Sequence, residues 1–413
     1  MVPLAGMVDT AFLGHLPQIR HLAGVGLAAI LFDYVYWTFG FLRMGTTGVT
    51  AQAHGRRDRE EVVLTLLRAC MMSVGIGLTI WLAQEPLREI GFSILSGTQT
   101  VEAAGREYWN GRILAAPFTL TNFVLIGWFL GREQSGRVLV LSAVGGFGNI
   151  VLDYLLIVRL GMSSYGAGLA TAMSQMAMFV VGLSFTVGEW RIARKVARRT
   201  FDAQALRRLL ALNRDLMIRT LALITTLSVF TNTSSVLGTA FLAATTILER
   251  VITMASYFID GVAFAVETLA GIFESEGRDK SPLLRFAMGT GIAAGVTFAL
   301  AFAVFPTTLF ALLTDHADVL AIIYRHVWWL LPTLFFGAAA YVLDGYFIGL
   351  TKGAWLRKSM VTSALLGAAP VTIVAYLMRS THLLWVGLVM FMVMRAWTLW
   401  RLVPRTLNQS PME

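Results

Sequence analysis

The chain has 413 residues, of which 56% are hydrophobic and only 14% charged, with a mean hydropathy of +0.69. This composition is too apolar and too poor in charge for a water-soluble globular domain, so it indicates a protein that crosses a membrane several times. The net charge of +9 would suggest nucleic-acid binding in a soluble protein, but basic loops on the cytoplasmic side of a membrane explain it better.

Twelve apolar segments have the character of membrane-spanning helices, each of which needs roughly 20 apolar residues. The first is short, because only fourteen residues precede His15, and we expect that part of this helix is missing from the chain. No cleavable signal sequence is indicated. The predicted segments are residues 1–14, 23–52, 62–83, 111–131, 137–158, 165–188, 209–235, 239–272, 285–312, 322–350, 356–378 and 383–404.

Basic residues gather in alternate connections between these segments. The richest connection, residues 189–208, lies between the sixth and seventh segments and divides the chain into halves, 1–188 and 209–413. We expect it to be a basic cytoplasmic linker that forms an amphipathic helix facing lipid headgroups. The positive-inside rule places the basic loops and both termini in the cytoplasm, and a bacterial inner membrane is the expected location.

A short motif occurs once in each half. Gly127-Trp128-Phe129-Leu130-Gly131 recurs as Gly345-Tyr346-Phe347-Ile348-Gly349, at an offset of 218 residues. At an offset of 217, Phe41-Leu42-Arg43 falls on Phe258-Ile259-Asp260. Two matches at nearly one offset predict a duplicated unit of six helices, and an even number of spans makes the two copies parallel.

The fifth segment carries a carboxamide and a carboxylate among apolar residues. Asn149 and Asp153 are four residues apart and therefore share one helix face. An ionised carboxylate is costly in hydrocarbon, so such a residue usually faces the inside of a helix bundle or a water-filled path. This pattern predicts an ion-coupling site of a transporter at Asp153.

Two further polar residues are expected at the same depth. Asp9 and Asp153 each lie six residues before the outer end of their segments, and Thr171 lies six residues inside the start of its own. At about 1.5 Å per residue, each is roughly 9 Å below the surface. Asp9, Asn149, Asp153 and Thr171 could therefore converge, and neighbouring carboxylates could hold and release a proton. The alternative is that each acid extends to water at the interface and does nothing else.

Five charged residues lie nearer the cytoplasmic ends of their segments, and charges inside a membrane usually pair. Arg43 and Asp260 occupy repeat-equivalent positions with opposite signs, so they could close the cytoplasmic side as a gate. Equally, each could belong to a static ion pair within one half, such as Arg219 with Asp344. Glu267 is a further candidate for such a pair.

The sequence resembles the multidrug and toxic compound extrusion family, and most closely its DNA-damage-inducible F branch. The stretches that carry the resemblance span both halves and are residues 8–16 (VDTAFLGHL), 41–48 (FLRMGTTG), 127–132 (GWFLGR) and 260–265 (DGVAFA). The resemblance implies an all-α membrane protein in which twelve helices form two pseudo-symmetric six-helix lobes arranged as a V. It also implies export of amphipathic, often cationic compounds in exchange for protons or sodium ions.

The family's N-lobe coupling residues match Asp9, Asn149, Asp153 and Thr171. The seventh segment contains no acid in its core, where Thr231 and Asn232 are the polar residues, so protons are the expected coupling ion rather than sodium. We expect a monomer in the lipid bilayer with no cofactor, no metal site and no nucleic-acid partner.

Two other functions are open to this sequence. A flippase for lipid-linked precursors would need several cations in its central cavity, whereas the N-terminal half has acids there. A membrane enzyme would need clustered metal ligands or a nucleophile with its base, but the six histidines are scattered and no such motif occurs.

Overall fold

The computed structural model describes residues 12–14, 18–95, 97–311, 313–314 and 316–407. Within these ranges the chain is helical, with eleven helices or helix pairs long and apolar enough to cross a membrane. They correspond to the second through twelfth predicted segments. The first predicted segment, 1–14, lies outside the described residues except for a helical stretch from Phe12 to Gly14.

The described residues divide into two compact units. The first unit consists of the residues up to Thr50 and Asp58–Arg207, and the second consists of Ala51–Arg57 and the residues from Arg208 onward. The end of α3 therefore groups with the second unit, where Gln52 Nε2 donates a hydrogen bond to the Gly349 carbonyl oxygen at 3.0 Å.

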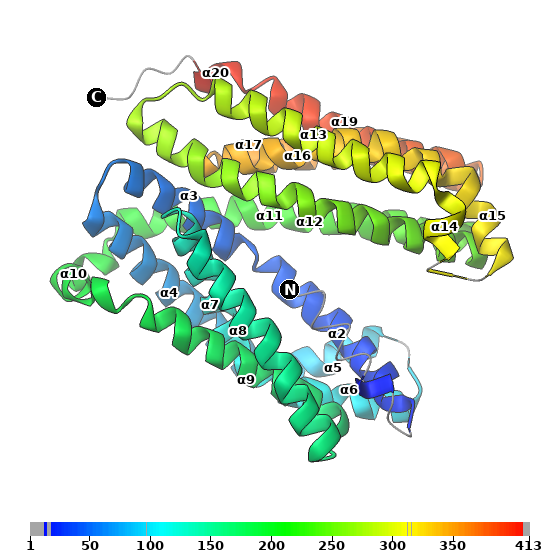
Figure 1. Cartoon of the computed structure of the whole chain (residues 1–413), viewed down its shortest axis with the longest axis horizontal. Helices are drawn as coiled ribbons and strands as arrows, with labels where there is room; N and C mark the ends of the chain where they lie inside the picture. The colour runs from blue at the N-terminus through cyan, green and yellow to red at the C-terminus, as the bar shows by residue number, and fades with distance from the viewer. Residues whose placement is uncertain (1–11, 15–17, 96, 312, 315, 408–413) are drawn as a thin grey trace. The chain divides into compact units, whose positions relative to one another are not determined.

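Helices α4, α7, α8 and α9 of the first unit run side by side (Figure 1). Its helices are α2 (Arg20–Thr38), α3 (Phe41–Gly55), α4 (Arg59–Leu82), α5 (Gln84–Ile94), α6 (Gln99–Arg112), α7 (Ala116–Leu130), α8 (Ser135–Asp153), α9 (Ser163–Ser184) and α10 (Trp190–Val196). A 3₁₀ turn at Ile113–Ala115 joins α6 to α7, where Pro117 occupies the first turn of α7 and lacks the amide hydrogen that a continuous helix would use.

Helix α16 packs against α12, α13 and α19 in the second unit (Figure 1). Trp385 and Phe391 of α19 are fully buried in the apolar core of this unit. Its helices are α11 (Ala203–Leu237), α12 (Thr239–Glu276), α13 (Ser281–Val304), α14 (Pro306–Ala311), α15 (Ala317–His326), α16 (Leu330–Gly349), α17 (Gly353–Thr362), α18 (Ala369–Leu377), α19 (Thr381–Trp400) and α20 (Pro404–Leu407).

The basic stretch 189–208 is docked on the first unit. Glu60, in the first turn of α4, accepts hydrogen bonds from Lys195 and Arg199, both at 2.7 Å. Arg68 of α4 donates to the Arg199 carbonyl oxygen at 3.0 Å. The stretch is therefore a short helical segment fixed to α4, and the long helix α11 begins within it at Ala203.

The helix boundaries repeat between the two units. Helices α8 and α17 begin at Ser135 and Gly353, and helices α9 and α19 begin at Ser163 and Thr381. Both differences equal 218 residues, the offset at which the glycine motif recurs. The duplication inferred from the sequence is therefore present in the structure as two copies of one helix pattern.

The repeated glycines mark where helices cross closely. A side-chain carbon at Gly127 would overlap the Arg43 carbonyl oxygen and lie 3.1 Å from its carbonyl carbon, so α7 contacts the backbone of α3. Gly345 of α16 meets Ala263 of α12 in the same way, again with 3.1 Å to the carbonyl carbon. Small residues at such crossings let membrane helices approach to van der Waals contact.

Candidate ion-coupling site

Helix α8 buries Asn149 and Asp153 and exposes several of its apolar side chains. Its buried residues are Leu141, Asn149 and Asp153, and Asp153 has 0% of its surface exposed. Phe147 and Val151, on the other face, are 60% and 58% exposed. This pattern is the reverse of a helix in a water-soluble protein, and it is the arrangement expected of a carboxylate held inside a membrane bundle.

The helix changes its hydrogen-bond pattern directly after Asp153. Residues Tyr154–Arg159 form a π-helical turn, in which the Leu160 amide donates to the Leu155 carbonyl oxygen at 2.9 Å. Turns of this kind insert an extra residue into a helix and occur frequently at functional sites. Both carboxylate oxygens of Asp153 are buried at this junction.

Thr171 of α9 lies at the same level along the bundle as the interval between Asn149 and Asp153. A side-chain carbon at Gly148 would contact Ser174 of α9, and one at Gly166 of α9 would contact Leu156. Because the helices run antiparallel, these two contacts set a register in which residue 171 is level with residue 151 along the bundle. Thr171 donates a hydrogen bond to the Ala167 carbonyl oxygen at 3.1 Å, so its hydroxyl oxygen can still accept one.

The amide group of Asn149 completes this level of the bundle. Asn149 is 5% exposed, and its Nδ2 is buried without a hydrogen-bond partner among the residues that the structure describes. A buried amide donor is costly to leave unmatched, so this atom is suited to bind an oxygen that enters the site.

Asp9, the fourth predicted residue, lies outside the described residues. The nearest described part of its segment packs beside the site, because the ring of Phe12 lies 6.2 Å from the ring of Tyr154, the residue after Asp153. The side chain of Leu13 is also buried.

Polar side chains also contact one another deeper in the first unit, and these contacts were not predicted. Asn122 of α7 donates two hydrogen bonds to Gln175 of α9, to its carbonyl oxygen and its Oε1, both at 2.9 Å. The hydroxyl of Thr121, the residue before Asn122, lies 3.1 Å from the hydroxyl of Ser73 on α4. Amide side chains in the middle of apolar segments were the available signal for Asn122 and Gln175.

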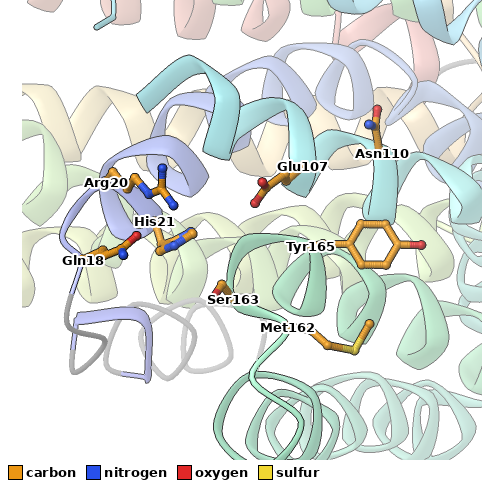
Figure 2. A pocket seen from close by; sticks show the side chains of 8 residues that line it. All are labelled: Gln18, Arg20, His21, Glu107, Asn110, Met162, Ser163 and Tyr165. Carbon is orange, nitrogen blue, oxygen red and sulfur yellow. The ribbon is translucent and has the colours of Figure 1, made fainter. Parts of the chain in front are cut away.

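A cavity of about 630 Å³ opens at the end of the first unit where α9 begins (Figure 2). Its lining comes from the start of α2, from α6 and from the start of α9, and includes Arg20, His21, Glu107 and Tyr165. His21 Nδ1 lies 2.8 Å from the Ser164 hydroxyl, which ties α2 to α9 at the cavity. Asp153 lies six residues before Arg159, the end of the π-helical turn that follows α8, which is roughly 9 Å along a helix.

Comparisons with known proteins agree with this architecture. A family model described as MatE matches residues 1–155. The chain is 33% identical over 97% of its length to the DNA damage-inducible protein F of Escherichia coli K12 and covers 88% of that protein. It is 24% identical to the chloroplastic protein DETOXIFICATION 44 of Arabidopsis thaliana, over 98% of this chain and 79% of the relative.

The chain belongs to the MATE family. Its fold also matches the solved structure of a MOP superfamily transporter from Pyrococcus furiosus, with a TM-score of 0.86 at 18% identity over 99% of this chain and 93% of that one. MATE proteins are multidrug and toxin efflux transporters of the membrane, and the relatives found here are transporters rather than enzymes.

The second unit of this MATE transporter contains a buried charge cluster. Asp344 of α16 accepts a hydrogen bond from Arg219 of α11, and its same oxygen, Oδ2, accepts another from Arg395 of α19 at 2.6 Å. All three side chains are at most 6% exposed. The structure thus brings together Arg219 and Asp344, and adds Arg395, which the sequence did not single out.

The remaining predicted charges lie on two helices, one in each unit. Arg43 lies on α3 in the first unit, whereas Asp260 and Glu267 lie on α12 in the second. Glu267 is 1% exposed. Thr231 of α11 donates to Glu249 of α12 at 3.1 Å, so a carboxylate does reach the polar part of the seventh predicted segment, although it comes from the neighbouring helix.

Proposed function

We propose that this MATE transporter exports amphipathic, often cationic small molecules in exchange for protons, with Asp9, Asn149, Asp153 and Thr171 as the coupling site. The observation that carries the proposal is the inverted burial of α8. A helix that presents apolar side chains outward holds one amide and one fully buried carboxylate inward. A buried carboxylate binds a proton or a cation more readily than it remains an isolated charge.

The surroundings of Asp153 support ion exchange rather than a purely structural role. The cavity lined by Arg20, His21 and Glu107 gives an aqueous approach at the near end of the unit. The π-helical turn after Asp153 provides a backbone that can alter its hydrogen bonds when the charge changes. Binding of a proton would favour one conformation of the transporter, and binding of substrate another, as linkage requires.

The cytoplasmic location of both termini and a bacterial inner membrane are part of this proposal. Basic residues occupy the ends of the helices remote from the cavity, including the docked segment with Arg194, Lys195 and Arg199. The positive-inside rule makes that side cytoplasmic. The cavity then opens outward, where an entering proton would be taken up.

The test is efflux of a cationic dye from proteoliposomes under separately imposed proton and sodium gradients. We expect the parent protein to accelerate efflux when a proton gradient is applied, and the Asp153→Asn variant to fall to the rate seen without a gradient. The variant keeps the shape and hydrogen-bonding capacity of the side chain but cannot hold a proton. Glu133→Gln is the matched control, since this exposed acid lies at a helix connection of the same unit.

Three outcomes would change the proposal. Unchanged gradient-driven efflux in Asp153→Asn would remove this residue from the mechanism. Acceleration by a sodium gradient alone would replace the proton as the coupling ion. Absence of dye efflux by the parent under either gradient would favour transport of lipid-linked precursors instead.

A further inference from the structure

A small pocket of about 220 Å³ lies in the second unit, away from the coupling site. It is formed by α17, by the end of α19 and by α20. Its lining contains two cations, three hydroxyl groups and an indole ring, from Lys358, Arg405, Ser359, Thr362, Thr398 and Trp355. In the part of the chain that the structure describes, no carboxylate lines the pocket.

The chain around this pocket is strongly unbalanced in charge. From residue 345 to residue 412 the sequence contains seven basic residues and no Asp or Glu; the seven are Lys352, Arg357, Lys358, Arg379, Arg395, Arg401 and Arg405. Asp344, the last acid before this stretch, already binds Arg219 and Arg395. Arg357 has a partner in Asp215, at 3.3 Å.

Lys358 and Arg405 differ from the paired arginines Arg357 and Arg395. Among the residues that the structure describes, neither forms an ion pair. Two cations that share a pocket repel each other unless an anion lies between them.

Two of the three hydroxyl groups use their protons within the protein. Thr398 donates its proton to the Met394 carbonyl oxygen at 2.6 Å, so in the 2.6 Å contact between Ser359 and Thr398 it is Ser359 that donates. That bond fixes the floor of the pocket between α17 and α19. Trp355 and Thr362 add an indole N–H and a hydroxyl to the two cations. This set of donors matches a phosphate group, which accepts several hydrogen bonds and carries negative charge.

Five of the seven equivalent positions in the first unit are apolar, whereas those of Trp355 and Leu402 are Arg137 and Ser184. Subtracting the offset of 218 from Lys358, Ser359, Thr362, Thr398 and Arg405 gives Val140, Leu141, Val144, Val180 and Val187. Because the helix starts keep this offset, the comparison is between equivalent sites. The polar pocket is therefore a feature of one unit and not a general consequence of the fold.

Apolar surface continues from the pocket along the spanning helix. Thr362 ends α17, and Leu365 and Leu366, which come next on the same segment, are 62% and 67% exposed. Trp397 and Trp400 are exposed near the end of α19, as aromatic residues commonly are at the boundary between headgroups and hydrocarbon. A ligand that places a phosphate in the pocket and acyl chains along this surface would match both the basic pocket and the exposed apolar side chains.

We propose that this pocket binds the phosphate of an anionic phospholipid headgroup. The probe is the purified full-length protein in detergent, titrated with short-chain phosphatidylglycerol, with phosphatidylcholine and with inorganic phosphate, and followed by its thermal unfolding midpoint. Phosphatidylglycerol is expected to raise the midpoint of the parent at concentrations where the other two have no effect. In Lys358→Gln/Arg405→Gln the apparent affinity should fall about 30-fold, the effect of removing two interfacial cations.

Two variants keep the test decisive if the double variant is poorly folded. Lys358→Arg/Arg405→Lys retains both charges and should respond like the parent. Arg401→Gln removes a cation at the same end of α19, one that stacks on Trp397 at 4.2 Å and does not line the pocket, and it should also respond like the parent.

The proposal is overturned if the double glutamine variant and the parent respond alike, if Arg401→Gln loses as much affinity as the double variant, or if phosphatidylcholine acts as strongly as phosphatidylglycerol. An equal response to inorganic phosphate would show that the ligand is a free phosphate, and the lipid assignment would fall.

Discussion

The buried ionisable residues of this protein are held in two different ways. Asp153 is fully buried in the first unit, one helical turn from Asn149 on the same helix. Asp344 is instead clamped by Arg219 and Arg395 in the second unit. A carboxylate bound by two arginines suits a structural brace, whereas Asp153 is the carboxylate that the proposed function assigns to ion exchange.

The Asp344 cluster predicts unequal costs for its members. Asp344→Asn removes the carboxylate that two buried arginines share and should lower stability by about 3–5 kcal/mol. Arg395→Met leaves a neutral pair of Arg219 and Asp344 and should cost only about 1–2 kcal/mol, within the usual range for point mutations. Unfolding of both variants in detergent measures the difference. Equal losses would mean that Arg395 is as necessary as the carboxylate it binds.

At the scale of elements, two local devices shape the units. Helix α8 ends in a π-helical turn at Asp153, and α17 is followed by another at Ser363–Ala368. Glycines at helix crossings bring neighbouring backbones together. The repeated motif was visible in the sequence. Its role at helix crossings is seen only in the structure, where Gly127 packs against the Arg43 backbone and Gly345 against the Ala263 backbone.

The close crossing of α16 and α12 can be tested with one methyl group. Gly345→Ala should destabilise the protein by about 1–3 kcal/mol, because the added carbon overlaps the Ala263 backbone, which cannot move easily. Gly289→Ala is the control: nothing lies within 4 Å of its added carbon, and alanine favours helix over glycine. The thermal midpoint should fall for the first variant and stay or rise for the second. A fall of the same size in both would contradict the packing argument.

At the scale of the whole molecule, two units with repeated helix boundaries contain different charges. The first has the buried Asp153 and the second has the Asp344 cluster and the basic pocket. Under the proposed function, divergence after duplication would let the first unit serve ion exchange while the Asp344 cluster braces the second. Arg43 and Asp260 belong to different units, so their role as a cytoplasmic gate stays a prediction.

The orientation in the membrane gives a prediction for the entire chain. In a Cys70→Ser background, which removes the sole cysteine, a membrane-impermeant maleimide applied to intact cells should label Thr98→Cys and not Arg278→Cys. Both positions are exposed and lie at connections between helices, but Arg278 belongs to a basic loop and should be cytoplasmic. Labelling of Arg278→Cys alone would invert the topology and place the cavity of the first unit inside the cell.

The sequence alone determined the membrane class, the spans from the second onward, the duplication and the family resemblance. These follow from hydropathy and short motifs, because a span must satisfy its backbone hydrogen bonds within one helix and must be apolar over its length. Its composition and depth pattern also predicted Asn149, Asp153 and Thr171 as a site, since a carboxylate in hydrocarbon is costly wherever its partners lie; the site stays a prediction.

Only the tertiary structure decided which side chains meet. Arg395 lies 51 residues from Asp344, and Asn122 lies 53 from Gln175, so no local pattern pairs them. The docking of residues 189–208 on α4 and the pocket around Lys358 and Arg405 likewise depend on helices distant in the chain. Helical periodicity sets which face a residue occupies, whereas its partner is chosen by how neighbouring helices pack.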